Sequence, residues 1–186
     1  MARIAPVRRE EVAPEYQTLY DEMKNAATGV VGGPYRVLMH TPDVALPWRR
    51  WIEDTLRGGL KMPLSLMEIA VLVTAREERC EYVWNAHTRA AERAGTRPEA
   101  VKVVRGEALE ATLTEDEATV LLFAEQLVRD RKVSDAVFDR LKARWGESDV
   151  IRLTSIIGCY RVVATLLAAF EITPESEGQV NTFPRR

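Results

Sequence analysis

Residues 65–95, which read SLMEIAVLVTAREERCEYVWNAHTRAAERAG, predict two consecutive helices. The first begins with a capping-box pattern, in which Ser65 is followed three residues later by Glu68. The apolar face of this helix consists of Ile69, Leu72 and Val73. The second helix is expected over residues 80–94, because Gly95 is the residue type that most often follows a helix. Two adjacent amphipathic helices therefore form the expected centre of the fold.

Helix signals recur on both sides of this stretch, whereas no segment shows the strict alternation of apolar and polar residues that is typical of a strand. The capping-box pattern recurs at Thr96 with Glu99 and at Thr114 with Glu117. Further helices are expected over residues 14–28, 41–57, 98–106, 115–130, 134–145 and 148–170. The sequence therefore predicts an all-α fold, a single-domain helical bundle of seven to eight helices over residues 1–186. Its core is expected over about 14–173, and residues 174–186 are expected to form a tail.

The composition is that of a globular chain, since 46% of the 186 residues are apolar and 29% are charged. The 26 basic and 28 acidic side chains are spread along the chain, so neither nucleic acid nor an anionic membrane is an expected partner. The most apolar stretch, residues 156–170, contains Arg161 and is shorter than the ~20 residues of a membrane-spanning helix. The first residues, MARIAPVRRE, lack the apolar core of a secretory signal, so the expected location is cytoplasmic.

Residues 80–87 concentrate reactive side chains. Cys80 and His87 lie seven residues apart, so at about 100° per residue their directions on a helix differ by only about 20°. Trp84 and Ala91 occupy the same stripe, so both reactive groups are expected to point into a partly apolar environment. Such surroundings move pKa values, and a thiol near a histidine or a helix N-terminus becomes a better nucleophile. Glu68, on the preceding helix, is placed to bring a carboxylate toward this stripe.

Each of these residues also has a structural interpretation. Glu68 is explained equally well as the acidic half of its capping box. Cys80 is explained as a small buried hydrophobe, and Cys159, in a mostly apolar helix, is assigned that role alone. His87 has the interpretation of a hydrogen-bonded structural residue, which is the role assigned to His40. Two cysteines and two histidines at these positions predict neither a disulfide framework nor a zinc site.

The stretch resembles the carboxymuconolactone decarboxylase and alkylhydroperoxidase D-like family. The resemblance begins around residues 37–42 and is strongest over residues 64–95. Its most specific part is Glu68, then Cys80 twelve residues later, then His87 after seven more. This spacing is similar to that of the peroxidase branch, in which a glutamate is followed after eleven residues by a Cys-x-x-Cys pair and after three more by a histidine. An aromatic residue and a histidine on one helix are similar to the decarboxylase-like branch.

The resemblance implies an alkylhydroperoxidase D-like helical fold, homo-oligomers such as trimers or hexamers, and a substrate pocket near a subunit interface. No cofactor and no metal are expected. It implies two sets of site residues: the catalytic Glu68, Cys80 and His87, and the pocket-lining Tyr82, Val83 and Trp84. Val83 stands where the peroxidase branch has its second cysteine, so the intramolecular disulfide of that branch cannot form, and Cys159 is no obvious substitute. An oligomer would also explain the aromatic residues Trp48 and Trp51.

Three functions are consistent with these residues. In the first, a decarboxylase-like lyase acts on a small organic acid or lactone, with His87 as general acid or base and Glu68 orienting it. Arg89 or Arg161 then binds a substrate carboxylate. In the second, Cys80 attacks a hydroperoxide as a thiolate, and an external thiol reductant resolves the sulfenic acid. In the third, the chain is a non-catalytic oligomeric binding protein with a vestigial pocket.

Overall fold

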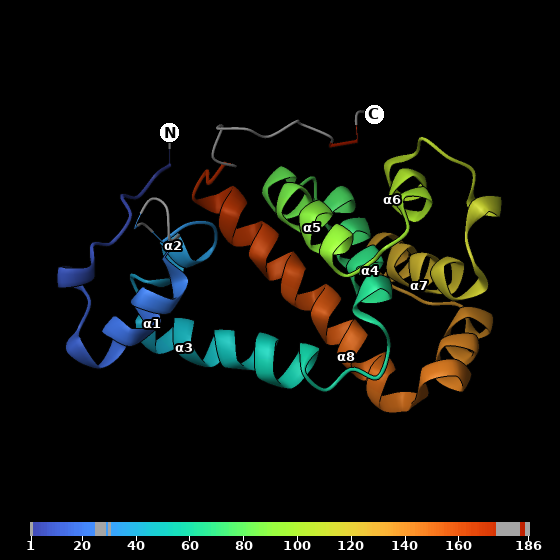
Figure 1. Cartoon of the computed structure of the whole chain (residues 1–186), viewed down its shortest axis with the longest axis horizontal. Coiled ribbons are helices and arrows are strands. Elements are labelled where there is room, and N and C mark those ends of the chain that lie inside the picture. Colours follow the sequence, from blue (N-terminus) through green and yellow to red (C-terminus); the bar gives the residue numbers. More distant parts are fainter. Residues whose placement is uncertain (1, 25–28, 30, 174–182, 185–186) are drawn as a thin grey trace.

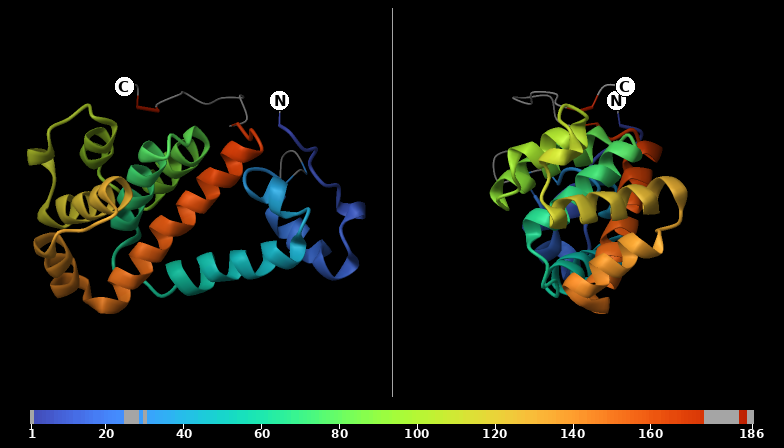
Figure 2. Two further views of the ribbon diagram at one scale, coloured as in Figure 1. Left: turned by 180° about the vertical axis from the view of Figure 1, so that it is seen from behind. Right: turned by 90° about the vertical axis from the view of Figure 1, so that its right-hand side faces the viewer.

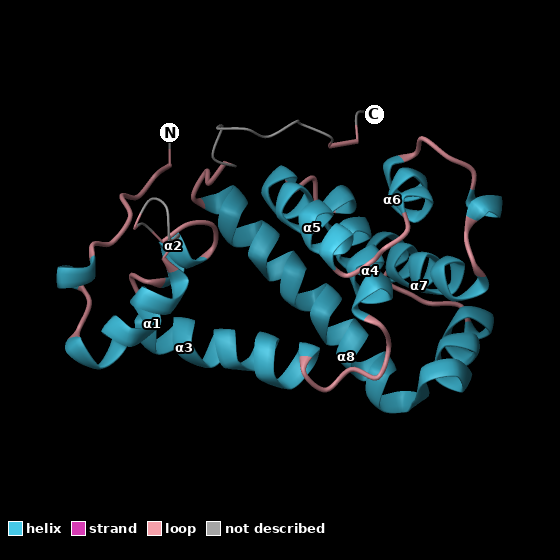
Figure 3. Ribbon diagram, viewed as in Figure 1, coloured by secondary structure: helices cyan, strands magenta, loops and turns pink. Residues whose placement is uncertain are grey.

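The computed structural model describes residues 2–24, 29, 31–173 and 183–184. Within this part of the chain every regular element is a helix, and Figure 3 shows helices joined by loops, with no strand. The α-helices are α1 (Gln17–Met23), α2 (Tyr35–Leu38), α3 (Pro42–Arg50), α4 (Leu64–Glu77), α5 (Glu81–Arg93), α6 (Pro98–Arg105), α7 (Glu115–Glu125) and α8 (Asp135–Ala169). Shorter helical segments are η1 (Arg9–Glu11), η2 (Pro14–Tyr16), η3 (Trp51–Arg57), η4 (Glu110–Thr112) and η5 (Gln126–Asp130). The predicted all-α fold class is confirmed.

Helix α4 forms the centre of the main helical bundle. Every residue from Leu66 to Ala75 is buried, and α4 contacts α5, α6, α7 and α8. In Figure 1 these four helices lie around α4. A helix that is apolar on all sides needs neighbours on all sides, which is why these segments pack against it. Glu68 belongs to this buried run, so its carboxylate is held inside the bundle.

Helix α8 is the longest helix and crosses the molecule diagonally (Figure 1). Gly146 has φ 82 and ψ 166, a conformation that only glycine adopts readily, so the helix bends there. The bend falls where the sequence predicts one helix to end and the next to begin.

Within the described part of the chain, α8 is also the one helix long and apolar enough to cross a membrane by length and composition. Residues 156–170, the most apolar stretch of the sequence, are only part of this helix, so the length expected from that stretch is too short. Half of the most apolar window of α8 is buried inside the protein, as is typical of a core helix.

A second, smaller apolar cluster lies at the N-terminal end of the chain. It contains residues of α1, α2 and the start of α3, together with Val12 and Val31. Figure 2 shows these elements at one end of the molecule, with α3 and η3 leading from them toward α8. Trp48, on α3, packs against both apolar clusters. His40, just before α3, donates from Nε2 to the carbonyl oxygen of Ala5 at 3.0 Å, which is a structural role.

The loop between η3 and α4 is fastened to α8 by a buried carboxylate. Asp149 is fully buried, and its Oδ2 accepts hydrogen bonds from the backbone N–H groups of Lys61, at 3.0 Å, and Met62, at 2.6 Å. A buried carboxylate is stabilised by such donors, because an unpaired charge inside a protein is costly. This contact fixes the position of η3 relative to the bundle.

Local helix signals are correct at some positions and wrong at others. The capping box at Thr114 is confirmed, since its hydroxyl accepts from the N–H of Glu117 and the Glu117 carboxylate accepts from its N–H. The capping box at Ser65 is wrong, because α4 begins at Leu64 and no side chain caps it. At Thr96 the hydroxyl donates to the carbonyl oxygen of Ser65, at 2.9 Å, and does not cap α6. The first helix ends at Met23, short of the predicted range.

Candidate functional site

A cavity of about 310 Å³ lies between α5, α8, η3 and the N-terminal elements. Apolar walls are provided by Trp48, Ile52, Val83, Ala86, Ala90 and Val163. The polar side chains converge from four elements: Tyr35 from α2, Glu53 and Arg57 from η3, Tyr82, His87 and Arg93 from α5, and Tyr160 from α8. An apolar cavity of this size with a few convergent polar groups is typical of a small-molecule site.

His87 is held at the wall of this cavity by Glu68. The Nδ1 atom of His87 lies 2.6 Å from Oε2 of Glu68, and the two side chains are 12% and 4% exposed. A carboxylate can only accept a hydrogen bond, so Nδ1 carries the proton in this pair. The packing of α4 against α5 thus brings together Glu68 and His87, two of the residues predicted from the sequence. Nε2, the other ring nitrogen of His87, takes no part in this hydrogen bond.

Tyr160 packs against the other side of the histidine. The two rings meet edge to face, with centroids 4.6 Å apart and planes at 80°. Nη2 of Arg57 donates a hydrogen bond to the hydroxyl oxygen of Tyr160, and the Arg57 guanidinium lies 5.9 Å from the centre of the same ring. Burial raises the pKa of the Tyr160 phenol far above its ordinary value, so this hydroxyl stays protonated at neutral pH.

Arg57 reaches the cavity from an unusual backbone segment. The segment η3 continues α3 with the wider π-helical turn, a feature that is frequent at functional sites. Glu53, one turn earlier, places Oε2 3.7 Å from Nη1 of Arg57. Neither Arg57 nor Tyr160 was selected as a site residue from the sequence. They lie 103 positions apart and far from the motif, so no local spacing indicates that they meet.

Cys80 does not share the cavity with His87. It precedes α5 in a non-helical conformation, with φ −96 and ψ 88. The prediction that Cys80 and His87 share one face of a helix is therefore wrong, because Cys80 is not part of the helix. Cys80 instead lines a second cavity of about 300 Å³ between the start of α5 and the end of α8. Burial raises the pKa of its thiol, and hydrogen bonds from the backbone N–H groups of Val83 and Tyr82 oppose this rise. Burial also raises the pKa of Cys159, to about 12.

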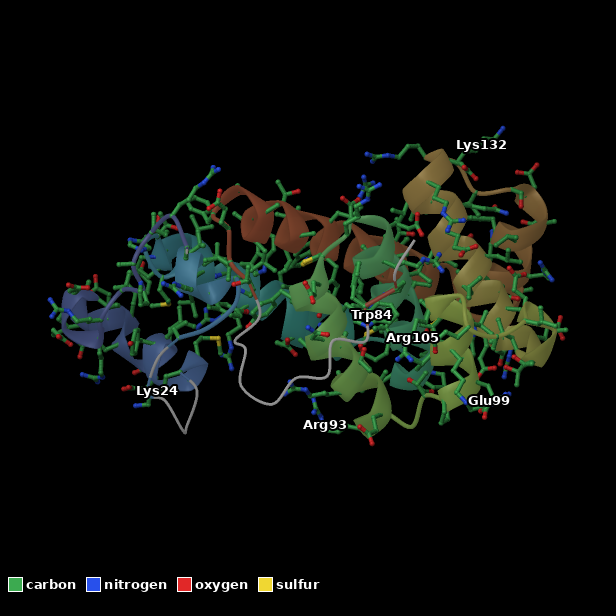
Figure 4. The ribbon with its side chains drawn as sticks, turned by 90° about the horizontal axis from the view of Figure 1, so that it is seen from above. Lys24, Trp84, Arg93, Glu99, Arg105 and Lys132 are labelled. Carbon is green, nitrogen blue, oxygen red and sulfur yellow. The ribbon has the colours of Figure 1, made fainter. Side chains whose placement is uncertain are left out.

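The three predicted pocket residues do not all line the cavity of His87. Val83 and Tyr82 both line the cavity of His87, and Tyr82 also lines the second cavity. Trp84 does not line this cavity, because its side chain is fully buried in the core, which is the structural role that its helical spacing also indicates. It meets the ring of Phe183 edge to face at 5.8 Å, and Figure 4 shows it beside the short segment that carries Phe183.

The arginines proposed to bind a carboxylate lie elsewhere. Arg161 pairs with Glu78, with Nε 2.5 Å from Oε1, and Arg89 is exposed outside the cavity wall. Among the described residues, no three His, Cys, Asp or Glu side chains gather closely enough to share a metal ion. The charged groups at the cavity of His87 are therefore Arg57, Arg93, Glu53 and the Glu68 carboxylate behind the histidine.

Comparison with known proteins agrees with this architecture. Residues 42–126 match the model of the carboxymuconolactone decarboxylase family. No curated protein matches the chain. A solved structure described as an alkylhydroperoxidase AhpD core, an uncharacterized peroxidase-related protein from Ralstonia eutropha JMP134, is similar with a TM-score of 0.79 at 16% identity, covering 99% of this chain and 98% of that one.

An uncharacterized peroxidase-related protein from Silicibacter sp. TM1040 is similar with a TM-score of 0.73 at 15% identity, covering 96% and 95% of the two chains. At such identities the likeness establishes the fold. Residues 42–126 thus match the carboxymuconolactone decarboxylase family model, and the chain has an alkylhydroperoxidase D-like fold.

Proposed function

We propose that the protein is a small-molecule enzyme of the decarboxylase-like kind, in which His87 acts as general acid or base on an organic acid or lactone. The observation that carries this proposal is the 2.6 Å contact between His87 Nδ1 and Glu68 Oε2 at the wall of an apolar cavity. Histidine is the side chain best suited to proton transfer near neutral pH. Glu68 fixes which ring nitrogen carries the proton and how the ring is oriented.

The walls of the cavity support a small substrate with an apolar body. Trp48, Ile52 and Val163 offer apolar surface, while Arg93 supplies positive charge for an acidic group. Arg93 therefore replaces Arg89 and Arg161 in the role of carboxylate ligand. Exclusion of water from such a site strengthens each polar contact that the substrate makes.

A panel of carboxylated γ-lactones and 2-oxo acids tests this function. Wild-type protein is expected to convert at least one member, with release of CO₂ or opening of the ring followed by mass spectrometry. His87→Ala is expected to abolish this turnover, while Arg89→Ala, outside the cavity, preserves it. Full turnover by His87→Ala on the same compound contradicts the proposal.

Hydroperoxide reduction at Cys80 is the second candidate function. It is favoured by the peroxidase-related descriptions of the two similar structures and by the two backbone N–H groups that face the Cys80 sulfur. The thiolate would attack one peroxide oxygen, the O–O bond would break, an alcohol or water would leave, and an external thiol would reduce the resulting sulfenic acid. Against it, burial raises the pKa of this thiol, and His87 lines another cavity.

Stopped-flow oxidation by hydrogen peroxide and by cumene hydroperoxide separates the two candidates. Fast consumption of peroxide that Cys80→Ser abolishes and Cys159→Ser preserves supports the peroxidase. Oxidation of Cys80 at the rate of an ordinary free thiol removes this candidate.

We further propose that the chain forms a homo-oligomer, a trimer or hexamer. Exposed apolar side chains support this proposal, since Ile151 and Val162 on α8 are 66% and 44% exposed and Trp51 on η3 is 42% exposed. Ile151 and Val162 are eleven residues apart, which places them on one side of the helix. Light scattering is expected to show an oligomer that Val162→Lys dissociates and Leu109→Lys, in a distant loop, does not. A monomeric wild-type protein contradicts the proposal.

A further inference from the structure

The hydrogen-bonded pair of Tyr160 and Arg57 has no role in proton transfer by His87 alone. Both residues line the cavity, and they come from α8 and η3, whereas the histidine comes from α5. Two polar side chains from separate elements are thus brought together at the wall of an otherwise apolar cavity. Burying polar groups costs free energy, so we ask what this pair contributes to the site.

The direction of the hydrogen bond determines what Tyr160 offers. Arg57 has no acceptor, so its Nη2 donates and the phenolic oxygen accepts. The proton of the phenol is then free to be donated to another group. A hydroxyl that accepts from a cation is polarised, and it becomes a stronger donor. Since burial keeps Tyr160 protonated at neutral pH, it is a donor and not a base.

The position of the pair relative to His87 completes the arrangement. The edge-to-face contact, with 4.6 Å between ring centroids, places a phenol donor next to an imidazole whose Nδ1 is occupied by Glu68. A proton acceptor and a polarised donor are therefore neighbours in one cavity. Their apolar surroundings increase the strength of a hydrogen bond to a developing negative charge.

We propose that Tyr160 donates a hydrogen bond to a substrate carbonyl oxygen that becomes an oxyanion as His87 removes a proton from the adjacent carbon. In this step Nε2 of His87 gains the proton, the C–H electron pair forms a carbon–carbon double bond, and the carbonyl π electrons move to the oxygen. Return of the proton reverses these changes. The substrate class is therefore a carbonyl compound that reacts through an enolate, an assignment that rests on the proposed function of His87.

The two residues have different tasks in this scheme. Tyr160 is a catalytic residue, since its hydroxyl touches the reacting oxygen. Arg57 is a positioning residue that acts through Tyr160, by holding the phenol in place and polarising it. The flanking Glu53 is half exposed at the cavity, and its Oε2 lies 3.7 Å from Nη1 of Arg57.

Binding of 4-nitrophenol tests the oxyanion site without knowledge of the substrate. Its phenolate is an oxyanion of about the size that the cavity admits, and its absorbance reports ionisation. Wild-type protein is expected to bind the phenolate more tightly than the phenol, so that the bound compound ionises at lower pH than the free one. Tyr160→Phe is expected to weaken phenolate binding on the order of tenfold, since a hydrogen bond to a charged group is lost.

Matched variants separate the specific contact from general charge. Arg57→Met is expected to weaken phenolate binding and Arg57→Lys to restore part of it. Arg89→Met removes the same charge from outside the cavity and is expected to have no effect. Far-UV circular dichroism and the Tm of each variant identify any that fail to fold, and Tyr160→Phe keeps the ring that packs on His87.

The outcomes distinguish this inference from the proposed function. Equal phenolate binding by wild type and Tyr160→Phe overturns the inference, as does a wild-type protein with no preference for the anion. If Tyr160→Phe weakens binding while His87→Ala keeps full turnover, the oxyanion site stands and the function proposed for His87 fails.

Discussion

Glu68 and His87, nineteen residues apart on α4 and α5, are joined by a 2.6 Å hydrogen bond between Oε2 and Nδ1 inside the helical bundle. The glutamate belongs to a helix that is buried on all sides, and the histidine lies where α5 meets the cavity. The imidazole of His87 provides this buried carboxylate with a hydrogen-bond donor. The pair therefore links the core of the fold to the chemistry proposed for the site.

Glu68→Gln is expected to lower kcat by about 10²- to 10⁴-fold, because the group that orients the proton-transferring histidine is lost. The amide has the same shape but does not fix the proton on Nδ1. Steady-state kinetics on the compound found in the panel, with circular dichroism as the control for folding, measures this effect. Wild-type kcat in Glu68→Gln would show that the carboxylate has only a structural role.

Asp149→Ala is expected to lower the free energy of unfolding by about 2–3 kcal/mol, because two backbone N–H groups in the loop between η3 and α4 lose their acceptor. Urea denaturation measures the loss. Asp139→Ala removes an exposed carboxylate from the same helix and is the matched control. Equal midpoints for the two variants would contradict the fastening role of Asp149.

Glu77 is expected to make folding stability depend on pH. Its hydrogen bonds from Arg129 and Arg76 hold the pKa of this carboxyl below its ordinary value. Its contribution is therefore present above the unfolded-state pKa and is lost as the pH falls through the lower folded-state pKa.

Urea denaturation of Glu77→Gln checks this sign. The variant is expected to be less stable than wild type by about 1 kcal/mol at pH 7, and this difference in unfolding free energy is expected to disappear toward pH 3. Glu107→Gln, which removes a more exposed partner of Arg105, serves as the control. A stability difference that widens as the pH falls would contradict a lowered pKa of Glu77.

Cys80 is expected to react slowly with iodoacetamide at neutral pH and faster as the pH rises past 9.0, because burial raises the pKa of the thiol above that ordinary value. Alkylation of the Cys159→Ser variant, followed by mass spectrometry, isolates Cys80. An apparent pKa well below 9.0 would instead favour the peroxidase candidate.

The part of the site that lies within one local stretch was predictable from the sequence. Residues 65–95 indicated two adjacent helices, and adjacent helices commonly pack together, so the approach of Glu68 to His87 followed. The same reasoning failed for Trp84, because a helix stripe is wide enough that Trp84 faces the core while His87, at its edge, faces the cavity.

Long-range contacts could not be predicted in this way. Arg57 and Tyr160 meet through the packing of the π-helical segment η3 against α8, and the contact of Asp149 with the loop before α4 holds η3 beside that helix. None of these features has a periodicity that a single sequence displays. The capping-box prediction at Ser65 is wrong because α4 begins at Leu64, which places Ser65 inside the helix, and Glu68 contacts His87 instead.

Incorporation of deuterium at the substrate carbon next to the carbonyl is the most direct test of proton transfer by His87. In D₂O, wild-type protein is expected to introduce deuterium next to the carbonyl of at least one 2-oxo acid or carboxylated lactone, as mass spectrometry would show, and His87→Ala is expected to introduce none above background. Exchange by His87→Ala at the wild-type rate, or no exchange by the wild-type protein on any member of the panel, would contradict proton transfer by His87.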